Sequence, residues 1–354
     1  MRFLLSSPFA AASFLAVACT STPALTPEPT ASPPPTPAPT ARPTPVPTPT
    51  PVPILSSQLL SDEHVIDGAM LSPDDPDHYG ATLSASYFSD GDAHHAYVVG
   101  FGPNPGDQQP FHATSADGVE WTVNAGDPLA ALESAFSPPG PVPGTVLHPT
   151  DDEWVMYLWG TPSPLVNGAE IYRATAADPG GPWTVDEEPV VPLGEPGEVD
   201  DLGLDFPAVL PTDEGWFMLY GANGGDRPHT ARILLATSPD GITWEKQGRV
   251  IEPQDCGGAD IDFTAMPRLF ADAGGGFLAF AEMGNDVFAL RSNDAIDWTC
   301  QEEPVFPISM IEGGDRVHTY AAGRNPEGGI NLMVESLFTS PDGVVTSNIW
   351  AAEM

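Results

Sequence analysis

The stretch "ATSPDGITWEK" at residues 236–246 decides the fold of this 354-residue chain, because the chain contains four close variants of it. In such a turn, Ser and Asp side chains accept hydrogen bonds from local backbone donors, glycine takes the positive φ and tryptophan packs beside it. We therefore interpret the stretch as a structural turn between two strands and not as a catalytic signature. The variants are "ATSADGVEWTV" (113–123), "RATAADPGGPWTV" (173–185), "RSNDAIDWTC" (291–300) and "TSPDGVVTS" (339–347).

The spacing of these turns indicates the architecture. The tryptophans of the first four turns lie 62, 61 and 54 residues apart: Trp121, Trp183, Trp244 and Trp298. A period of roughly 50–60 residues is typical of a four-stranded propeller blade with long loops. Segments such as "EWVMYLWG" (153–160) and "GWFMLYGA" (215–222) lie between the turns, and "INLMVES" (330–336) takes the third-strand place in the last copy. They alternate bulky apolar residues as half-buried strands do. The five copies predict an all-β, five-bladed β-propeller with very little helix.

The front of the chain reads as a targeting segment. Residues 1–19 contain one arginine, an apolar run, small residues and then a cysteine, as a secretory signal peptide does. "LAVAC" (15–19) resembles the bacterial lipoprotein box, which implies that Cys19 becomes a lipid-modified N-terminus; the alternative is ordinary signal cleavage. Residues 20–55 are so rich in Pro and Thr that they predict a disordered, extended tether. We expect residues 56–354 to form the single propeller, outside the membrane and anchored to the cell envelope.

The charge balance limits the possible partners. The chain has 49 acidic residues against 11 Lys and Arg, which gives a net charge of −38. Such a charge argues against nucleic acid and anionic membrane surfaces, so we expect membrane contact through the lipid anchor only. It suits a neutral ligand or a bound cation.

The cysteines other than Cys19 flank one repeat. Cys256 and Cys300 are the two that remain, and in an exported protein they predict a disulfide. The alternatives are two buried thiols or a metal site, for which a CxxC pattern and a nearby histidine cluster are missing.

A resemblance extends this reading to function. The segment 205–246, from "DFPAVLPTDEGWFMLYGA" to "ILLATSPDGITWEK", resembles the five-bladed propeller glycoside hydrolases of families 32, 43 and 68. The resemblance is closest over the third blade. It implies a channel site in which carboxylates cleave a glycosidic bond as acid and base. Carried across, it assigns Asp67 as the base, Asp205 as the residue that sets the pKa of the acid, and Glu312 in "MIEGGDRVHTY" as the acid. The alternative for each is a solvated or turn-capping carboxylate.

Further candidates lie near these acids. Asp262 is another carboxylate at a strand start, and Arg268 and Arg316 each follow a candidate acid, which they could orient while holding a sugar hydroxyl. The alternative for each arginine is a structural salt bridge. His318 could face the channel, where some related enzymes hold a metal ion or water, and its alternative is a core imidazole. We expect the pair His94-His95 in an exposed loop. The chemistry requires no cofactor, although it is compatible with a calcium ion in the channel.

These observations predict an extracytoplasmic, monomeric glycosidase that acts on neutral oligo- or polysaccharides. The alternative is a non-catalytic surface lipoprotein that binds a glycan or a protein through the same channel, and a third possibility is a purely structural repeat protein. The sequence has no nucleophile-elbow pattern, phosphate-cradling loop or HExxH motif, which disfavours serine hydrolase, nucleotide-dependent and zincin chemistry.

Overall fold

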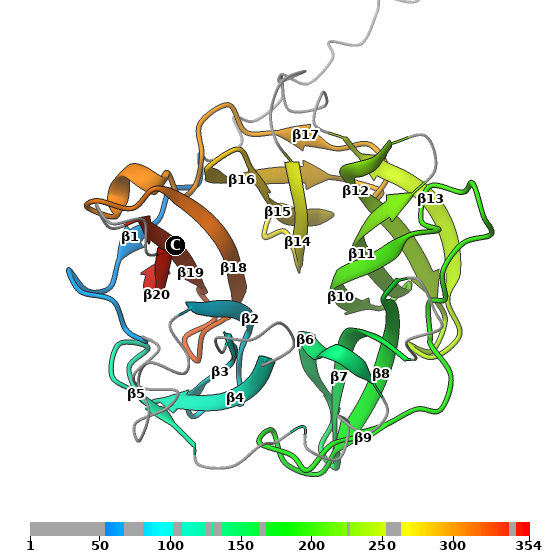
Figure 1. The fold of residues 1–354 in the computed structure, drawn as a ribbon, viewed down its shortest axis with the longest axis horizontal. Helices are drawn as coiled ribbons and strands as arrows, with labels where there is room; N and C mark the ends of the chain where they lie inside the picture. The colour runs from blue at the N-terminus through cyan, green and yellow to red at the C-terminus, as the bar shows by residue number, and fades with distance from the viewer. Residues whose placement is uncertain are drawn as a thin grey trace, which may run out of the picture. The chain divides into compact units, whose positions relative to one another are not determined.

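Five antiparallel sheets of four strands surround a central channel in the computed structural model (Figure 1). They belong to one compact unit, Pro53–Met354. The prediction of an all-β, five-bladed propeller is therefore confirmed. The structure describes residues 54–66, 81–101, 108–124, 129, 136–162, 168–224, 227–252, 263–339 and 345–354.

Each blade starts with its innermost strand at the channel and adds strands outward. The first two blades are β2 (Ala81–Ser89), β3 (His94–Phe101), β4 (Gln108–Ser115), β5 (Trp121–Val123), then β6 (Ser137–Thr150), β7 (Glu153–Thr161), β8 (Glu170–Ala176) and β9 (Thr184–Val185). The third and fourth are β10 (Gly203–Thr212), β11 (Gly215–Gly224), β12 (Arg227–Ser238), β13 (Glu245–Ile251), then β14 (Phe263–Ala271), β15 (Phe277–Met283), β16 (Asp286–Ser292) and β17 (Thr299–Cys300). The fifth contains β18 (Arg316–Arg324), β19 (Ile330–Thr339), β20 (Val345–Glu353) and β1 (Gln58–Leu59).

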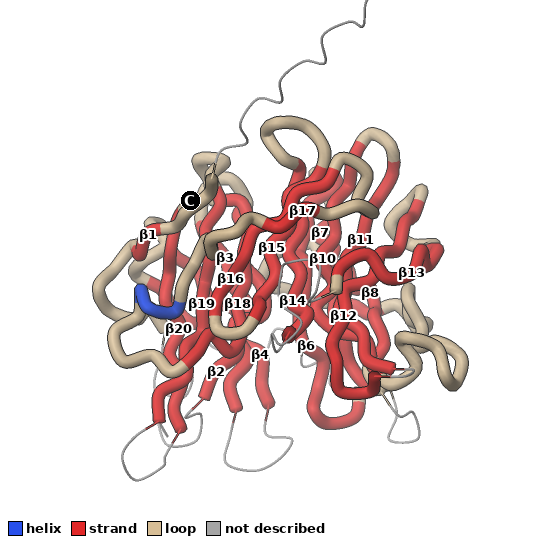
Figure 2. Tube along the Cα trace, turned by 90° about the horizontal axis from the view of Figure 1, so that it is seen from above, coloured by secondary structure: helices blue, strands red, loops and turns tan. Residues whose placement is uncertain are grey.

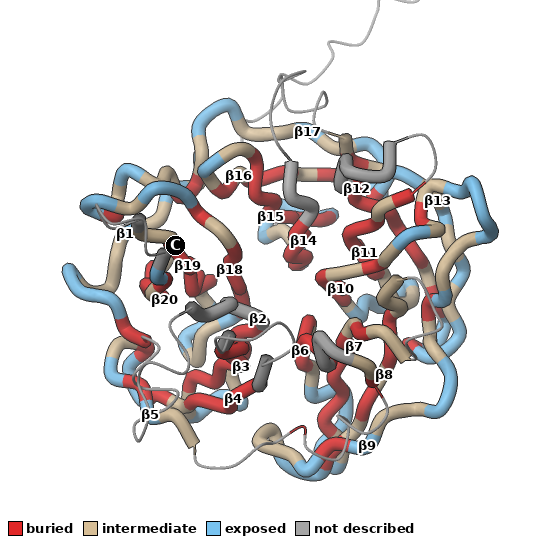
Figure 3. Tube along the Cα trace, viewed as in Figure 1, coloured by how far each residue is buried: buried red, intermediate tan, exposed pale blue. Residues whose placement is uncertain are grey.

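The core lies between neighbouring blades. Second strands are mostly apolar on both faces because a blade covers each face, and every residue of β15 is buried. Figure 3 shows the buried residues concentrated on the inner strands and the exposed ones at the rim. In the side view of Figure 2 the strands run between two faces of the propeller that carry the loops. The one helical segment in the described residues is the short 3-10 turn η2 (Ile308–Met310), and none of their helices is long and apolar enough to cross a membrane.

The repeated turn is structural, as the sequence predicts. Asp240 Oδ1 accepts hydrogen bonds from the backbone N–H groups of Ile242 and Thr243, at 2.9 and 2.8 Å. Ser238 Oγ accepts one from Gly241 N at 2.9 Å. The turns at 115–121 and 292–298 repeat these bonds, with Ala295 at φ +63° in the glycine position of the latter. The side chains of this motif are therefore used to close the turn.

The turn also joins neighbouring blades. Tyr157 of the second blade donates a hydrogen bond from its hydroxyl to Gly241 O of the third blade, at 2.6 Å. The second blade's own turn receives the same kind of bond, because the Tyr97 hydroxyl of the first blade donates to Pro179 O at 2.8 Å. Trp183 Nε1 in turn donates to the Tyr97 hydroxyl at 2.6 Å.

Gly241→Ala is expected to lower the free energy of unfolding by about 2–4 kcal/mol, because it adds crowding to an unfavourable backbone conformation. Gly241 has φ +74°, and a Cβ there would lie 2.8 Å from the Tyr157 hydroxyl and 3.0 Å from the Trp216 ring. Urea unfolding measures the loss. Gly248→Ala is the matched control, since Gly248 has φ +93° and a Cβ there meets nothing within 4 Å. Equal losses for the two variants would contradict the crowding.

The fifth blade corrects one part of the repeat assignment. β1 pairs with β20, with Gln58 opposite Glu353 and Leu59 opposite Ala352, so the fourth strand of this blade comes from the N-terminal side of the domain. "TSPDGVVTS" therefore follows the second strand of its blade, β19, and not a third strand. Assigning "INLMVES" as a third strand was wrong. Thr346, which stands in the tryptophan position, is the second residue of β20, an interior strand of the sheet and not an outer one.

The structure tests one half of the predicted disulfide. Cys300 on β17 is disulfide-bonded. Its expected partner Cys256 lies outside the described residues, as do Cys19 and the predicted signal and most of the predicted tether, so the identity of the partner stays a prediction.

Candidate functional site

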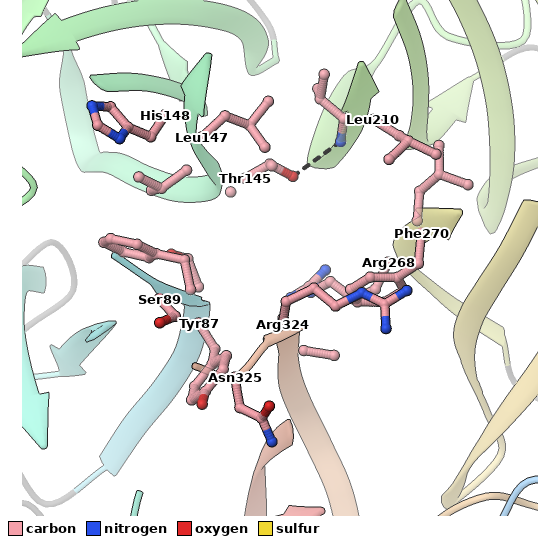
Figure 4. Close-up of a pocket in the computed structure, with 18 of the residues that line it drawn as sticks. Tyr87, Ser89, Thr145, Leu147, His148, Leu210, Arg268, Phe270, Arg324 and Asn325 are labelled. Atoms are coloured by element: carbon pink, nitrogen blue, oxygen red, sulfur yellow. Dashed lines mark hydrogen bonds between the residues drawn. The ribbon is translucent and has the colours of Figure 1, made fainter. Parts of the chain in front are cut away.

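The five innermost strands enclose a cavity of about 470 Å³ in the channel (Figure 4). Each of these strands is the first of its blade, so all five run the same way along the channel. The described lining residues lie in the later parts of β2, β6, β10, β14 and β18 or just beyond them. The cavity therefore opens where the innermost strands end, at the mouth opposite to the strand starts where the sequence placed most of the candidate acids.

The cavity has a distinctive chemistry. In Figure 4 the labelled side chains surround an open centre, with Thr145 from β6, Leu210 from β10, and Arg268 and Arg324 from β14 and β18. None of the described lining residues is Asp or Glu. This part of the channel can bind a ligand, but its described residues do not supply the carboxylate pair that glycoside cleavage needs.

Asp205 lies at the other end of β10, on a strained piece of backbone. A bulge separates Asp205 from Ala208, and Phe206 between them has φ +45°. Such a conformation costs a non-glycine residue on the order of 1–3 kcal/mol. Packing holds it in place, because the Phe206 ring lies 5.4 Å from the Trp159 ring and 5.8 Å from the Arg268 guanidinium carbon. A bulge of this kind redirects the neighbouring side chain, here that of Asp205.

The carboxyl group of Asp205 is enclosed and poorly satisfied. The residue as a whole is half-buried, but its Oδ1 atom is completely buried and has no hydrogen-bond partner. Burial raises the pKa of Asp205 from its usual 3.8 to about 7, because the charged form loses its hydration. A carboxyl group with this pKa is partly protonated at neutral pH and can donate a proton.

Arg268 contacts both Phe206, which follows Asp205, and Tyr320 of the fifth blade. It is buried, donates from Nη1 to Pro267 O at 2.8 Å and from Nη2 to Tyr320 O, and its guanidinium carbon lies 5.1 Å from the Tyr320 ring. Burial lowers the pKa of Arg268. It lines the cavity at the end of β14, and not the start of the strand where the sequence placed it beside a candidate acid, and its role as a binding residue stays a prediction.

His318 is held by a carboxylate that the sequence reading missed. Its Nδ1 lies 3.0 Å from Glu335 Oε2, which also accepts a hydrogen bond from Thr319 Oγ1 at 2.7 Å. Glu335 is completely buried on β19, and its Oε1 has no hydrogen-bond partner. Because the carboxylate accepts from Nδ1–H, Nε2 of neutral His318 is left as an acceptor on a side chain that is 38% exposed. The lone acid within apolar "INLMVES" was the available signal.

Two further candidates, Glu312 and Arg316, are not among the described lining residues of the cavity. Glu312 is exposed in the turn between η2 and β18, and Arg316 is exposed at the first position of β18. Asp67 and Asp262 lie outside the described residues. Glu282, another acid of the fourth blade, is buried on the second strand β15. Within the described residues no group of three or more His, Cys, Asp or Glu is arranged to hold a metal ion, and the calcium expectation stays untested.

The pair His94-His95 does not lie in an exposed loop. Both residues begin β3 and are buried, so that expectation was wrong. His95 Nδ1 lies 3.0 Å from His112 Nε2, and His95 Nε2 lies 3.1 Å from Asp90 Oδ2. The His112 ring continues the chain of contacts, with Nδ1 3.0 Å from Asn124 Nδ2. Burial, with the neighbouring His95, lowers the pKa of His112 to about 4.

His112 is expected to make the protein acid-sensitive. Its folded pKa of about 4 lies below the ordinary 6.5, so the unfolded chain takes up the proton first as pH falls. Stability that is present above pH 6.5 is thus lost toward pH 4, by about 3 kcal/mol for this group. His112→Gln should flatten the fall of the melting temperature over this window, and His148→Gln, at an exposed histidine of β6, is the control. An equally steep fall in His112→Gln would contradict the assignment.

Comparisons with known proteins support the five-bladed fold and identify no activity for this chain. No protein-family model matches the sequence. Over 118 residues the chain is 33% identical to Uncharacterized protein Rv1502 of Mycobacterium tuberculosis strain H37Rv, and equally to Uncharacterized protein MT1551 of strain CDC 1551. Each alignment covers 31% of this chain and 37% of the relative's length.

Several solved structures that resemble the chain are glycoside hydrolases. One described as "Glycoside hydrolase" superimposes with a TM-score of 0.61 at 14% identity, covering 84% of this chain and 92% of that one. A thermostable family-43 glycoside hydrolase gives 0.58 at 14% identity, over 77% and 90%. Zg3597, a family 117 glycoside hydrolase from Zobellia galactanivorans, gives 0.60 at 15% identity, over 84% and 90%. At such identities the likeness establishes the five-bladed fold alone.

Proposed function

We propose that this protein is a glycosidase that acts on neutral glycans outside the membrane, with Asp205 as the proton donor. The observation that supports it is the enclosed Asp205 carboxyl group, whose pKa burial raises to about 7. A glycosidic oxygen must be protonated as its bond breaks, and a carboxyl group with a raised pKa is the usual donor. The fold shared with glycoside hydrolases is consistent with this chemistry.

This proposal changes the role expected of Asp205. The resemblance assigned proton donation to Glu312 and made Asp205 the residue that sets the acid's pKa. Glu312 is exposed in a turn, whereas Asp205 is enclosed on an innermost strand. We retain Asp67 as the proposed base, which would activate water for direct displacement on the opposite side of the bond. His318, oriented by Glu335, would hold a sugar hydroxyl or the water through Nε2.

A non-catalytic glycan-binding protein is the second candidate. The described lining residues of the channel cavity include no carboxylate, which suits binding without cleavage. Hydrolysis of a panel of aryl furanosides and pyranosides separates the two candidates. The glycosidase should release the aryl alcohol with a rate that falls as pH rises through about 7, because the donor must be protonated. No release from any member of the panel would overturn the glycosidase and leave the binding protein.

We also propose that Cys19 anchors the protein to the cell envelope through a lipid, with residues 20–55 as a spacer. Cys19→Ser should move the protein from the membrane fraction to the soluble fraction, because a thioether-linked lipid can no longer form. Immunoblotting of the two fractions measures this. Retention of the variant in the membrane fraction would contradict the anchor.

A further inference from the structure

We propose that the cavity where the innermost strands end binds a hexuronate, a sugar ring that carries a carboxylate, through Arg324 and Arg268. This site is separate from the proposed hydrolysis at Asp205, and its ligand is bound without being cleaved there. The proposal rests on three observations: the positive charge of the lining, the hydrogen bonds that fix the Arg324 guanidinium group, and two buried polar atoms without a hydrogen-bond partner.

The charge of the lining is opposite to that of the chain. Acidic residues outnumber Lys and Arg by 49 to 11, yet the described lining of this cavity has two arginines and no acid. Repulsion from acids elsewhere on the protein is screened over about 8 Å at physiological salt, so contacts inside the cavity decide the sign of the ligand. The cavity therefore favours a negatively charged group.

Arg324 is held in position for a carboxylate. Its Nη1 donates to Gly328 O at 3.0 Å and its Nη2 donates to Ala271 O at 3.1 Å, while its guanidinium carbon lies 5.7 Å from the centre of the Phe270 ring. These contacts use two of the five N–H donors of a guanidinium group. Among the described residues no acid forms an ion pair with Arg324, so its charge and remaining donors are available for the bidentate contact that guanidinium and carboxylate groups make.

Two buried polar atoms in the lining have no hydrogen-bond partner. Ser86 is 4% exposed, and its Oγ is buried and unpartnered at the bulge of β2. Asn325 donates from Nδ2 to Asn331 Oδ1 at 2.9 Å, but its own Oδ1 is buried and unpartnered. An unsatisfied buried polar group costs about 1–3 kcal/mol, and a small shift of either side chain toward a ligand hydroxyl would relieve this cost. This pairing favours a polyhydroxylated ligand over a simple anion.

The size and walls of the cavity suit a sugar ring. Its volume of about 470 Å³ lies in the usual range of about 300–1,000 Å³ for small-molecule sites. Leu147, Leu210 and Phe270 are among the apolar residues of the wall against which the C–H groups of a pyranose can pack. The volume and these walls together suit a single sugar ring.

Calorimetric titration of the full-length protein tests the proposal. D-glucuronate and D-galacturonate are the probes, D-glucose and D-galactose are their neutral counterparts, and sodium acetate and inorganic phosphate are the free anions, all at 0.15 M salt. We expect saturable binding of at least one uronate, at least 10-fold tighter than its neutral counterpart and than either anion. Equal binding of the neutral sugar, equal binding of an anion, or no saturable uronate binding would overturn the proposal.

Arg324→Gln supplies the residue-level test. The side chain is exposed, so the fold should survive, and we expect uronate affinity to fall at least 10-fold. Arg249→Gln on β13 is the matched control, because Arg249 pairs with Glu252 and does not line the cavity, and its affinity should stay at the wild-type value. Unchanged affinity in Arg324→Gln would overturn the assignment. The measurement needs no turnover, so its failure and the failure of the proposed hydrolysis are distinguishable.

Discussion

Asp205→Asn is expected to abolish hydrolysis while making the protein more stable at neutral pH. An amide cannot donate the proton that the leaving group needs, so we expect a loss of at least 100-fold in kcat. The amide also needs no ionisation in its enclosed position. Loss of activity together with a gain of stability separates a chemical role from damage to the fold.

The sign of the stability change follows from the pKa of Asp205. Its folded pKa of about 7 exceeds the ordinary 3.8, so the folded protein holds the proton between these values while the unfolded chain releases it. Wild-type stability contributed by the protonated group is thus present below pH 4 and lost as pH rises to about 7, by roughly 2–4 kcal/mol. Asp205→Asn lacks this loss, so its advantage in melting temperature should grow from pH 4 to pH 7.

Asp213→Asn is the control for both measurements. Asp213 is exposed in the hairpin at the far end of β10, and the substitution removes the same charge. Activity and pH dependence should stay at their wild-type values in this variant. Wild-type activity in Asp205→Asn would remove Asp205 from the chemistry, and a stability difference that does not change with pH would contradict its raised pKa.

Removal of the segment that closes the ring is expected to unfold the domain. A chain that begins at Asp67 lacks β1, the buried side chains of Val65 and Ile66, and the backbone bonds of Leu60 and Ser57. Burial of two aliphatic side chains and several hydrogen bonds contribute roughly 5–8 kcal/mol together. This approaches the whole stability of a typical domain, about 5–15 kcal/mol.

A chain that begins at Ile54 is the matched control, because it keeps each of these contacts. We expect its melting temperature to equal that of the full-length protein, whereas the shorter chain should show no cooperative transition by circular dichroism. A cooperative transition within a few degrees of the control would show that the ring holds without its N-terminal strand.

The blades could be predicted because their turns are local. Ser238, Asp240 and Gly241 satisfy one another's backbone within four positions, so the hydrogen bonds can be read from adjacent letters. The closure of the fifth blade could not be read in this way, because Gln58 and Glu353 meet only in the finished ring. The apparent fifth copy, "TSPDGVVTS", has the same local pattern, but it follows the second strand of its sheet and not the third.

In the candidate site, too, only the features that depend on nearby residues could be predicted from the sequence. Asp205 could be selected from its position at a strand start, but its raised pKa depends on burial that exists only in the folded ring. Glu335 was missed because a carboxylate inside an apolar strand departs from the alternation used to place residues. The buried His94-His95 pair was misplaced because histidines that follow Asp-Gly-Asp look like loop residues until the neighbouring strands cover them.

The pairing of Gln58 with Glu353 also sets the order of events during synthesis. The two residues are 295 positions apart, and a ribosome that adds about 5–20 residues per second separates their emergence by about 15–60 s. For that interval the first blade lacks the fifth blade beside it, and β1 has no strand with which to pair. The fifth blade can therefore be completed only after its last strand has been synthesised, and until then its early strand is an unpaired edge that favours aggregation.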